Sequence, residues 1–155
     1  KVQVKRLEGL VYECYIQLLR KEKLIKSITI DPNTFELKLI NENSKIIPFS
    51  RLSAGERQLL AVAMHWGLAR ASGRPIPCII DTPLGRLDSK HRKNLVENYF
   101  PFASHQVLLL STDEEIDDKR RKKLSPQIGR LYHLDYDDST QSTSVENGYF
   151  DMELA

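Results

Sequence analysis

Several features are scarce in this sequence of 155 residues, and each absence narrows the classes of protein it fits. Its two cysteines, Cys14 and Cys78, lie far apart and lack metal-ligand spacing, so a reducing compartment fits. No apolar run approaches the roughly 20 residues that span a bilayer, and no signal peptide is visible. The net charge of +2 is too small to indicate nucleic-acid binding by itself.

A phosphate-binding loop of the form G-x-x-x-x-G-K-[ST] is also missing, because Gly67, Gly73 and Gly85 have no lysine in register. If the chain works with a nucleotide, that loop must come from elsewhere. The sequence begins at Lys1 without methionine, directly in a helical pattern. We therefore expect a fragment of something longer.

The composition is that of a globular domain, with 41% hydrophobic and 28% charged residues. Residues 1–26 carry a heptad pattern. Its seam consists of Val4, Leu7, Val11, Cys14, Leu18, Lys21 and Ile25. The helix could pack on the domain or form the end of a coiled-coil arm, and one helix can do both. We divide the chain into residues 1–26, as the arm end, and residues 27–155.

Residues 27–49 alternate apolar and polar side chains, which predicts a three-stranded antiparallel meander. The expected inward residues are Ile28, Ile30, Phe35, Leu37 and Leu39, and polar turns are expected at 31–33 and 41–44.

The remaining pattern predicts an α/β fold. A helix over 53–71 is expected to bury Leu59, Val62, Ala63 and Trp66. Strands at 78–81 and 106–110, joined by a helix at 89–99, predict a parallel pair buried on both faces. A helix at 114–123, strands at 130–135 and 145–152, and a loop over 137–144 complete the expected order.

Ser53-Ala54-Gly55 stands where the long helix begins, which suits it to holding a phosphate. The serine hydroxyl, the open glycine backbone and the first N–H groups of the helix would all face one anion. The same segment also fits an ordinary capping box between Ser53 and Glu56.

Polar residues end both expected parallel strands, where ligands collect in open α/β sheets. Asp81 ends the first strand, and Thr112 lies just after the second. A carboxylate at the end of a buried strand needs a cation or hydrogen-bond donors. Asp88, in a tight turn after Asp81, could simply cap the next helix.

This order of motifs resembles the C-terminal lobe of an ABC-type (P-loop NTPase) ATPase head of the SMC/Rad50 class. The segment LSAGERQ, residues 52–58, matches the SMC-type signature, and the strand ending in Asp81 matches a Walker B strand. The segment DTPLGRLD, residues 81–88, more closely resembles the DndD ATPases of DNA phosphorothioate modification.

The resemblance implies roles for five positions. Ser53 and Gly55, with Ala54 and Glu56 beside them, would contact the γ-phosphate of ATP held by an opposite head. Asp81 would hold Mg²⁺, mostly through water. The Asp88 loop would cross the dimer interface beside the nucleotide.

Two catalytic positions depart from the common ABC pattern. Thr82 stands where most heads have a glutamate that polarises the attacking water, and the DndD-like wording carries the same threonine. Thr112 stands at the switch-histidine position, where it can donate a hydrogen bond but cannot become cationic. Threonine is no general base near neutral pH, so another group orients the water or hydrolysis is slow.

The resemblance thus implies a half-head that hydrolyses ATP only when joined to an N-terminal lobe with the Walker A loop and paired with a second head. Expected partners are DNA and other phosphorothioation proteins, in the cytoplasm of a bacterial or archaeal cell and without a membrane. A nucleotide-gated DNA clamp with little hydrolysis, or a repair ATPase outside phosphorothioation, are the alternatives.

The remaining polar residues carry weaker predictions. The basic run 119–123 could contact DNA phosphates, but pairing of its residues with Glu115, Asp117 and Asp118 at i,i+4 within one helix is favoured. His65 is expected to be a satisfied structural residue, and no structural zinc is proposed. Neither cysteine looks activated for sulfur chemistry.

Overall fold

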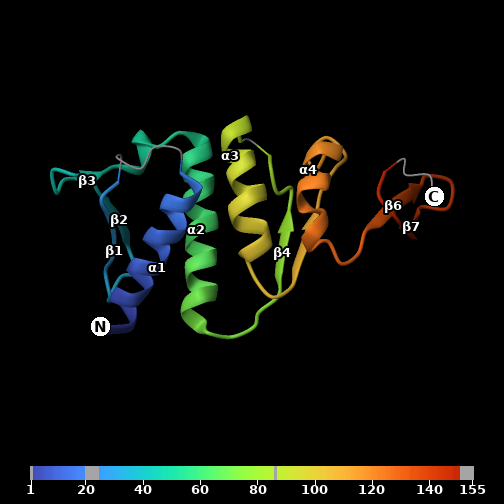
Figure 1. Ribbon diagram of the computed structural model, residues 1–155. Helices are drawn as coiled ribbons and strands as arrows, with labels where there is room; N and C mark the ends of the chain where they lie inside the picture. Colours follow the sequence, from blue (N-terminus) through green and yellow to red (C-terminus); the bar gives the residue numbers. More distant parts are fainter. Residues whose placement is uncertain (1, 20–24, 86, 151–155) are drawn as a thin grey trace.

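The computed structural model describes residues 2–19, 25–85 and 87–150 (Figure 1). Two long helices lie side by side, with a small antiparallel sheet beside them and a parallel strand pair farther along. Within the described residues, no helix is long and apolar enough to cross a membrane.

The predicted meander is present as an antiparallel sheet of β1 (Ser27–Ile30), β2 (Leu37–Ile40) and β3 (Ile46–Ile47). The Asp31 side chain accepts hydrogen bonds from two backbone N–H groups of the first turn, as an Asx turn requires. Phe35 was expected inside but is 72% exposed. It lies in that turn with a φ of 57°, outside the alternation of β2.

Helix α1 (Val2–Leu18) packs along α2 (Ala54–Ser72) and on β1. Its seam residues Val11, Cys14 and Leu18 are buried, so the helix does pack on the domain. The helix ends at Leu18 rather than near residue 26, and Lys21 lies outside the described residues. Its role as the end of a coiled-coil arm, with the boundary after residue 26, stays a prediction.

Helix α2 confirms the predicted helix almost to the residue. It buries Leu59, Ala63 and Trp66 and half-buries Val62. The Trp66 indole donates to the carbonyl of Phe102 and meets the ring of Tyr99 edge-on, with ring centroids 5.2 Å apart. The helix ends at Gly73, whose φ of 63° is the left-handed conformation typical of helix ends.

The predicted parallel pair is confirmed as β4 (Cys78–Asp81) and β5 (Val107–Leu110). The chain between them forms α3 (Ser89–Asn94) and continues through a π-helical turn (Leu95–Tyr99) and a 3₁₀ turn (Phe100–Phe102). That segment buries Leu95, Val96 and Tyr99, as expected.

The prediction that both strands are buried on both faces is wrong. Ile79 is 67% exposed, and Leu108 and Leu110 are 48% and 41% exposed. Residues that alternate with them, such as Cys78, point to the opposite, covered face. The strand pair therefore has one largely apolar face that the described residues of this chain cover only in part.

The C-terminal part differs most from expectation. Helix α4 (Asp118–Leu124) begins four residues late, because Asp117 caps it. Strands β6 (Tyr132–Asp137) and β7 (Ser142–Asn147) form a hairpin, so much of the predicted loop 137–144 is paired strand. The second strand ends at Asn147, short of Met152, which lies outside the described residues.

Two glycines give a matched test of the helix pair. A Cβ on Gly67 would lie 2.6 Å from Val11 Cγ2 and 2.9 Å from its Cα, whereas one on Gly9 would meet nothing within 4 Å. Gly67→Ala should lower the free energy of unfolding by about 1–3 kcal/mol, because backbone must move. Gly9→Ala should raise it by about 0.5–1 kcal/mol through helix propensity.

Chemical denaturation of both variants measures these changes. Stabilisation by Gly67→Ala similar to that by Gly9→Ala would contradict the close approach of α1 and α2.

Candidate nucleotide site at one edge of the fold

The residues predicted to act on a nucleotide lie toward the same edge of the molecule. Helix α2 begins at this edge, and β4 points its carboxyl end toward it (Figure 1). Strands β4 and β5 are parallel, and Asp81 is paired with Leu110. Asp81 and Thr112 therefore both lie at the carboxyl end of the strand pair. Asp88 begins α3 close by in the chain.

Ser53 forms the capping box that its spacing with Glu56 predicts. Its hydroxyl accepts a hydrogen bond from the Glu56 N–H at 3.2 Å, and the Glu56 carboxylate accepts from the Ser53 N–H at 2.8 Å. The Tyr15 hydroxyl donates to the Glu56 carbonyl and fixes the first turn of α2 against α1. The cap uses the serine oxygen only as an acceptor, so the hydroxyl proton remains available to an anion.

Asp81 is exposed, contrary to the expectation of a buried carboxylate. Its Oδ1 accepts a hydrogen bond from the Thr82 hydroxyl at 3.3 Å. Thr82 has a φ of 50°, which is unusual for a β-branched residue and costs about 1–3 kcal/mol. The backbone is therefore strained at Thr82, the residue predicted to stand in the place of a catalytic glutamate.

Asp88 caps α3, as the ordinary interpretation of that turn predicted. Its Oδ1 accepts from the N–H groups of Lys90 and His91, and its Oδ2 lies 3.2 Å from the buried His91 ring. The place of Asp88 in a loop that crosses a dimer interface stays a prediction, and Arg86 of that loop lies outside the described residues.

The turn after β5 contains contacts that the sequence did not reveal. Thr112 Oγ1 accepts from the Glu115 N–H at 3.3 Å, and a Glu115 carboxylate oxygen accepts from the Leu84 N–H at 3.0 Å. The Tyr149 hydroxyl lies 2.8 Å from the carbonyl oxygen of Ile116 and 3.2 Å from that of Thr112. Burial raises the pKa of Tyr149, which keeps this donor protonated.

The residues at this edge fit Mg²⁺ bound together with a nucleotide. Among the described residues no three His, Cys, Asp or Glu side chains gather into a metal site. Mg²⁺ keeps several waters and takes one or two carboxylates plus substrate phosphates, so the exposed carboxylate of Asp81 suits it. Any such ion would need the phosphates to complete its coordination.

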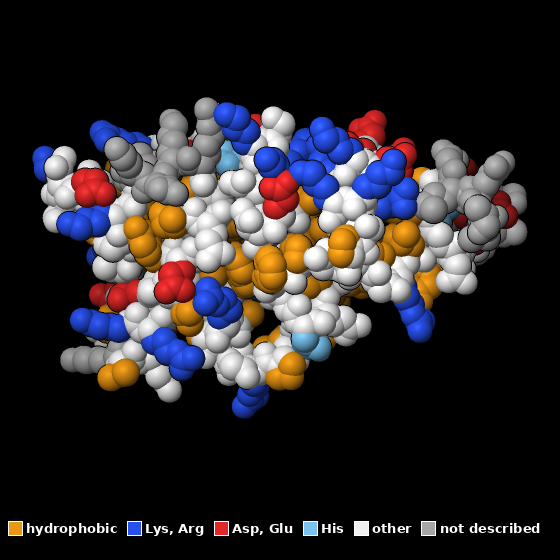
Figure 2. Space-filling model, in the orientation of Figure 1, with side chains coloured by type: hydrophobic (Ala, Val, Ile, Leu, Met, Phe, Trp, Pro, Cys, Tyr) orange, Lys and Arg blue, Asp and Glu red, His pale blue; other side chains and the backbone are white. Residues whose placement is uncertain are grey.

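The basic run is partly neutralised, but not by the predicted pairs. Arg120 bonds to Asp117, Arg121 bonds to Asp118, and Lys123 pairs with Glu97 of the neighbouring turn. The two pairs within this segment are spaced i,i+3, and Glu115 lies outside the helix. Figure 2 shows Lys and Arg side chains gathered along the upper edge, above α3 and α4.

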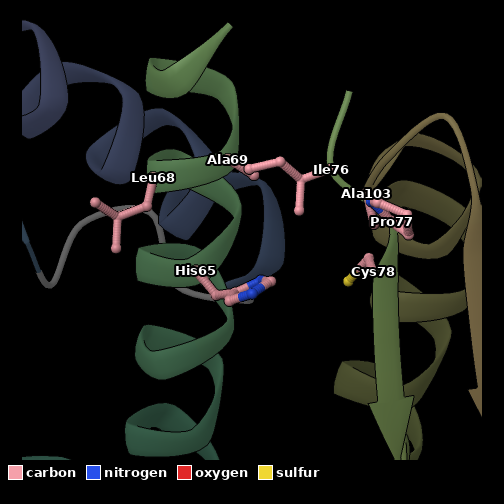
Figure 3. Close-up of a pocket in the computed structure, with 7 residues that line it drawn as sticks. All are labelled: His65, Leu68, Ala69, Ile76, Pro77, Cys78 and Ala103. Carbon is pink, nitrogen blue, oxygen red and sulfur yellow. The ribbon is translucent and has the colours of Figure 1, made fainter. Parts of the chain in front are cut away.

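A small open pocket of about 180 Å³ lies near the other end of β4. His65 points across it toward Cys78, whereas Leu68 points away (Figure 3). His65 is exposed, so the expectation of a satisfied structural histidine is wrong. Since Cys78 begins the strand that Asp81 ends, this pocket does not belong to the candidate nucleotide site.

Comparison with solved structures identifies the fold. One matching structure is described as structural biochemistry of ATP-driven dimerization and DNA-stimulated activation of SMC ATPases. It has a TM-score of 0.66 and 13% identity over 97% of this chain and 88% of that one. The fold is that of the C-terminal lobe of an SMC head.

Two further SMC heads agree. The head domain from Thermotoga maritima has a TM-score of 0.59 and 12% identity over 93% of this chain. A head with coiled coil and joint derived from Pyrococcus yayanosii has a TM-score of 0.62 and 14% identity over 92%. The chain spans 48% and 26% of their lengths.

These likenesses confirm the predicted fold class, and identities of this size establish the fold alone. No protein-family model and no curated protein matches the sequence. The closer likeness to DndD therefore stays a prediction.

Proposed function

We propose that this chain is the half of an SMC-like ATPase head that carries the signature and Walker B segments. The observation that carries the proposal is one edge of an SMC-head fold holding both the Ser53–Gly55 helix start and the Asp81 strand end. Either motif alone fits an ordinary cap or turn, but their combination in this fold fits ATP and Mg²⁺.

In this proposal the chain's residues act on the nucleotide from two sides. The Ser53 hydroxyl donates a hydrogen bond to the γ-phosphate of ATP on an opposite head. Gly55 and the neighbouring backbone N–H groups, at the positive end of the α2 dipole, face the same phosphate. Asp81 holds Mg²⁺ beside the ATP bound by its own head. The loop that contains Asp88 lies at the interface between two identical heads.

The missing phosphate-binding loop would come from an N-terminal lobe. The apolar face made by Ile79, Leu108 and Leu110 supports this, because contiguous exposed apolar side chains on a central strand pair mark a surface meant to be covered. We expect this fragment alone to have no ATPase activity.

The biological process that we propose is DNA phosphorothioate modification, on the DndD-like wording of residues 81–88. Closure of two heads on ATP would be coupled to DNA binding, nicking or remodelling alongside other phosphorothioation proteins. Lys119 and Lys122, which face no acidic partner within 4 Å among the described residues, are the free cations of α4 for DNA phosphates.

A nucleotide-gated DNA clamp with little hydrolysis is the second candidate. Thr82 and Thr112 favour it, because neither threonine can act as a base or a cation at the two positions where ABC heads normally use such groups. An SMC/Rad50-like repair ATPase outside phosphorothioation shares the same site chemistry.

Steady-state ATPase activity and ATP-dependent dimerisation of the complete protein, with and without DNA, test the proposal. Turnover together with ATP-dependent dimers supports the ATPase head. Dimers without turnover support the clamp. Neither ATP-dependent dimers nor turnover would contradict both.

A further inference from the structure

The proposed ATPase lacks its usual carboxylate at Thr82, and the neighbouring turn supplies another carboxylate in contact with the same loop. Glu115 comes from the turn after β5, yet its side chain reaches the loop after β4 and accepts the Leu84 N–H at 3.0 Å. A Cβ added to Gly85 would lie 3.8 Å from the same Glu115 oxygen and 2.9 Å from Thr82 Cγ2. Glu115 and Thr82 therefore flank one glycine.

Backbone hydrogen bonds and one buried side chain help to fix the shape of the loop after β4. The Thr82 N–H donates to the Leu110 carbonyl at 3.0 Å, and the Gly85 N–H reaches the Thr82 carbonyl at 3.4 Å. The Leu84 side chain is fully buried, which holds its backbone against the domain. Glu115 satisfies the Leu84 N–H, a donor that is costly to leave unpaired near the core.

The same glutamate also joins the loop to the turn that carries Thr112. The Glu115 N–H donates to Thr112 Oγ1, and the Tyr149 hydroxyl lies against the carbonyls of Thr112 and Ile116 on either side of Glu115. Asp113 and Glu114, the neighbouring acids, are exposed and make no hydrogen bond to the loop among the described residues. Glu115 alone of the three links the two turns.

We propose that Glu115 is a positioning residue that joins residues 82–85 to the Thr112 turn, so that both turns present one fixed surface to the nucleotide. The inference rests on the proposed function. It assigns to Glu115 the role of hydrogen-bond acceptor, which an amide oxygen can also fill, and not that of a base.

The test compares Glu115→Ala, Glu115→Gln and the control Glu114→Ala in the complete protein. Glu115→Ala should lower kcat by about 10- to 100-fold, because displaced loops misplace the reacting groups. KM for ATP should change less than about threefold, since the phosphate contacts remain. Glu115→Gln should keep most of kcat, and Glu114→Ala should match wild type.

Hydrogen exchange of the peptide containing Leu84 gives a second readout that needs no turnover. Exchange should be faster in Glu115→Ala and near wild type in Glu115→Gln and Glu114→Ala. A wild-type protein without turnover would contradict the proposed ATPase function, but the exchange data would still test whether Glu115 joins the two turns. The role of Glu115 would be overturned by a loss of kcat in Glu115→Gln equal to that in Glu115→Ala, or by unchanged Leu84 exchange in Glu115→Ala.

Discussion

Ser53→Asp is expected to leave the fold as stable as wild type while abolishing ATP-dependent dimerisation and turnover. Aspartate caps helices as well as serine does, so the hydrogen bond from the Glu56 N–H should remain. The free energy of unfolding should therefore change by less than about 0.5 kcal/mol. The carboxylate, however, has no proton to donate and carries a negative charge toward the γ-phosphate. Loss of one such donor alone costs about 100- to 1,000-fold in rate.

Thermal unfolding and light scattering with ATP measure the two effects separately. Ser44→Asp, in the exposed turn before β3 at a φ of 58° that aspartate adopts readily, is the matched control and should behave as wild type in both. Ser53→Asp with full turnover would show that the α2 start is only a helix cap, and the signature assignment would fail.

Asp81→Asn is expected to have the second large effect, and again without loss of stability. Asp81 is exposed, and the hydrogen bond that it accepts from the Thr82 hydroxyl is kept by the asparagine oxygen. The variant loses the negative charge that a hard divalent cation needs. Metal-assisted charge stabilisation is worth several kcal/mol, so kcat should fall by at least about 100-fold.

The dependence of turnover on Mg²⁺ concentration is the measurement. Asp81→Asn should need more Mg²⁺ for its residual activity, and Asp135→Asn, on exposed β6, should leave both rate and Mg²⁺ dependence unchanged. An unaltered Mg²⁺ dependence in Asp81→Asn would remove Asp81 from the metal site.

The sequence predicted those elements whose signals lie within a few residues. The capping box at Ser53, the apolar spacing of α2 and the stop at Gly73 made that helix predictable almost to its ends. Alternation and Asx turns did the same for β1 and β2.

The errors arose where distant contacts decide. Ile79 and Leu108 look like core residues whether this chain or a second lobe covers them, so their exposure could not be predicted. In β7 the side chains are exposed on both faces, which leaves no apolar alternation to read. The bond from Leu84 to Glu115 joins residues 31 positions apart, and only the paired ends of β4 and β5 bring them together.

Mixing two inactive variants tests the central claim, that two heads share each ATP. In a dimer of one Ser53→Asp head and one Asp81→Asn head, one site keeps Asp81 from the first head and Ser53 from the second, so it is intact. In an equal mixture, mixed dimers should form through this one intact site, and turnover should recover to about a quarter of the wild-type value when half of the dimers are mixed, although each variant alone is inactive. No recovery, although light scattering shows mixed dimers forming with ATP, would place Ser53 and Asp81 on the same nucleotide within one head and contradict the account.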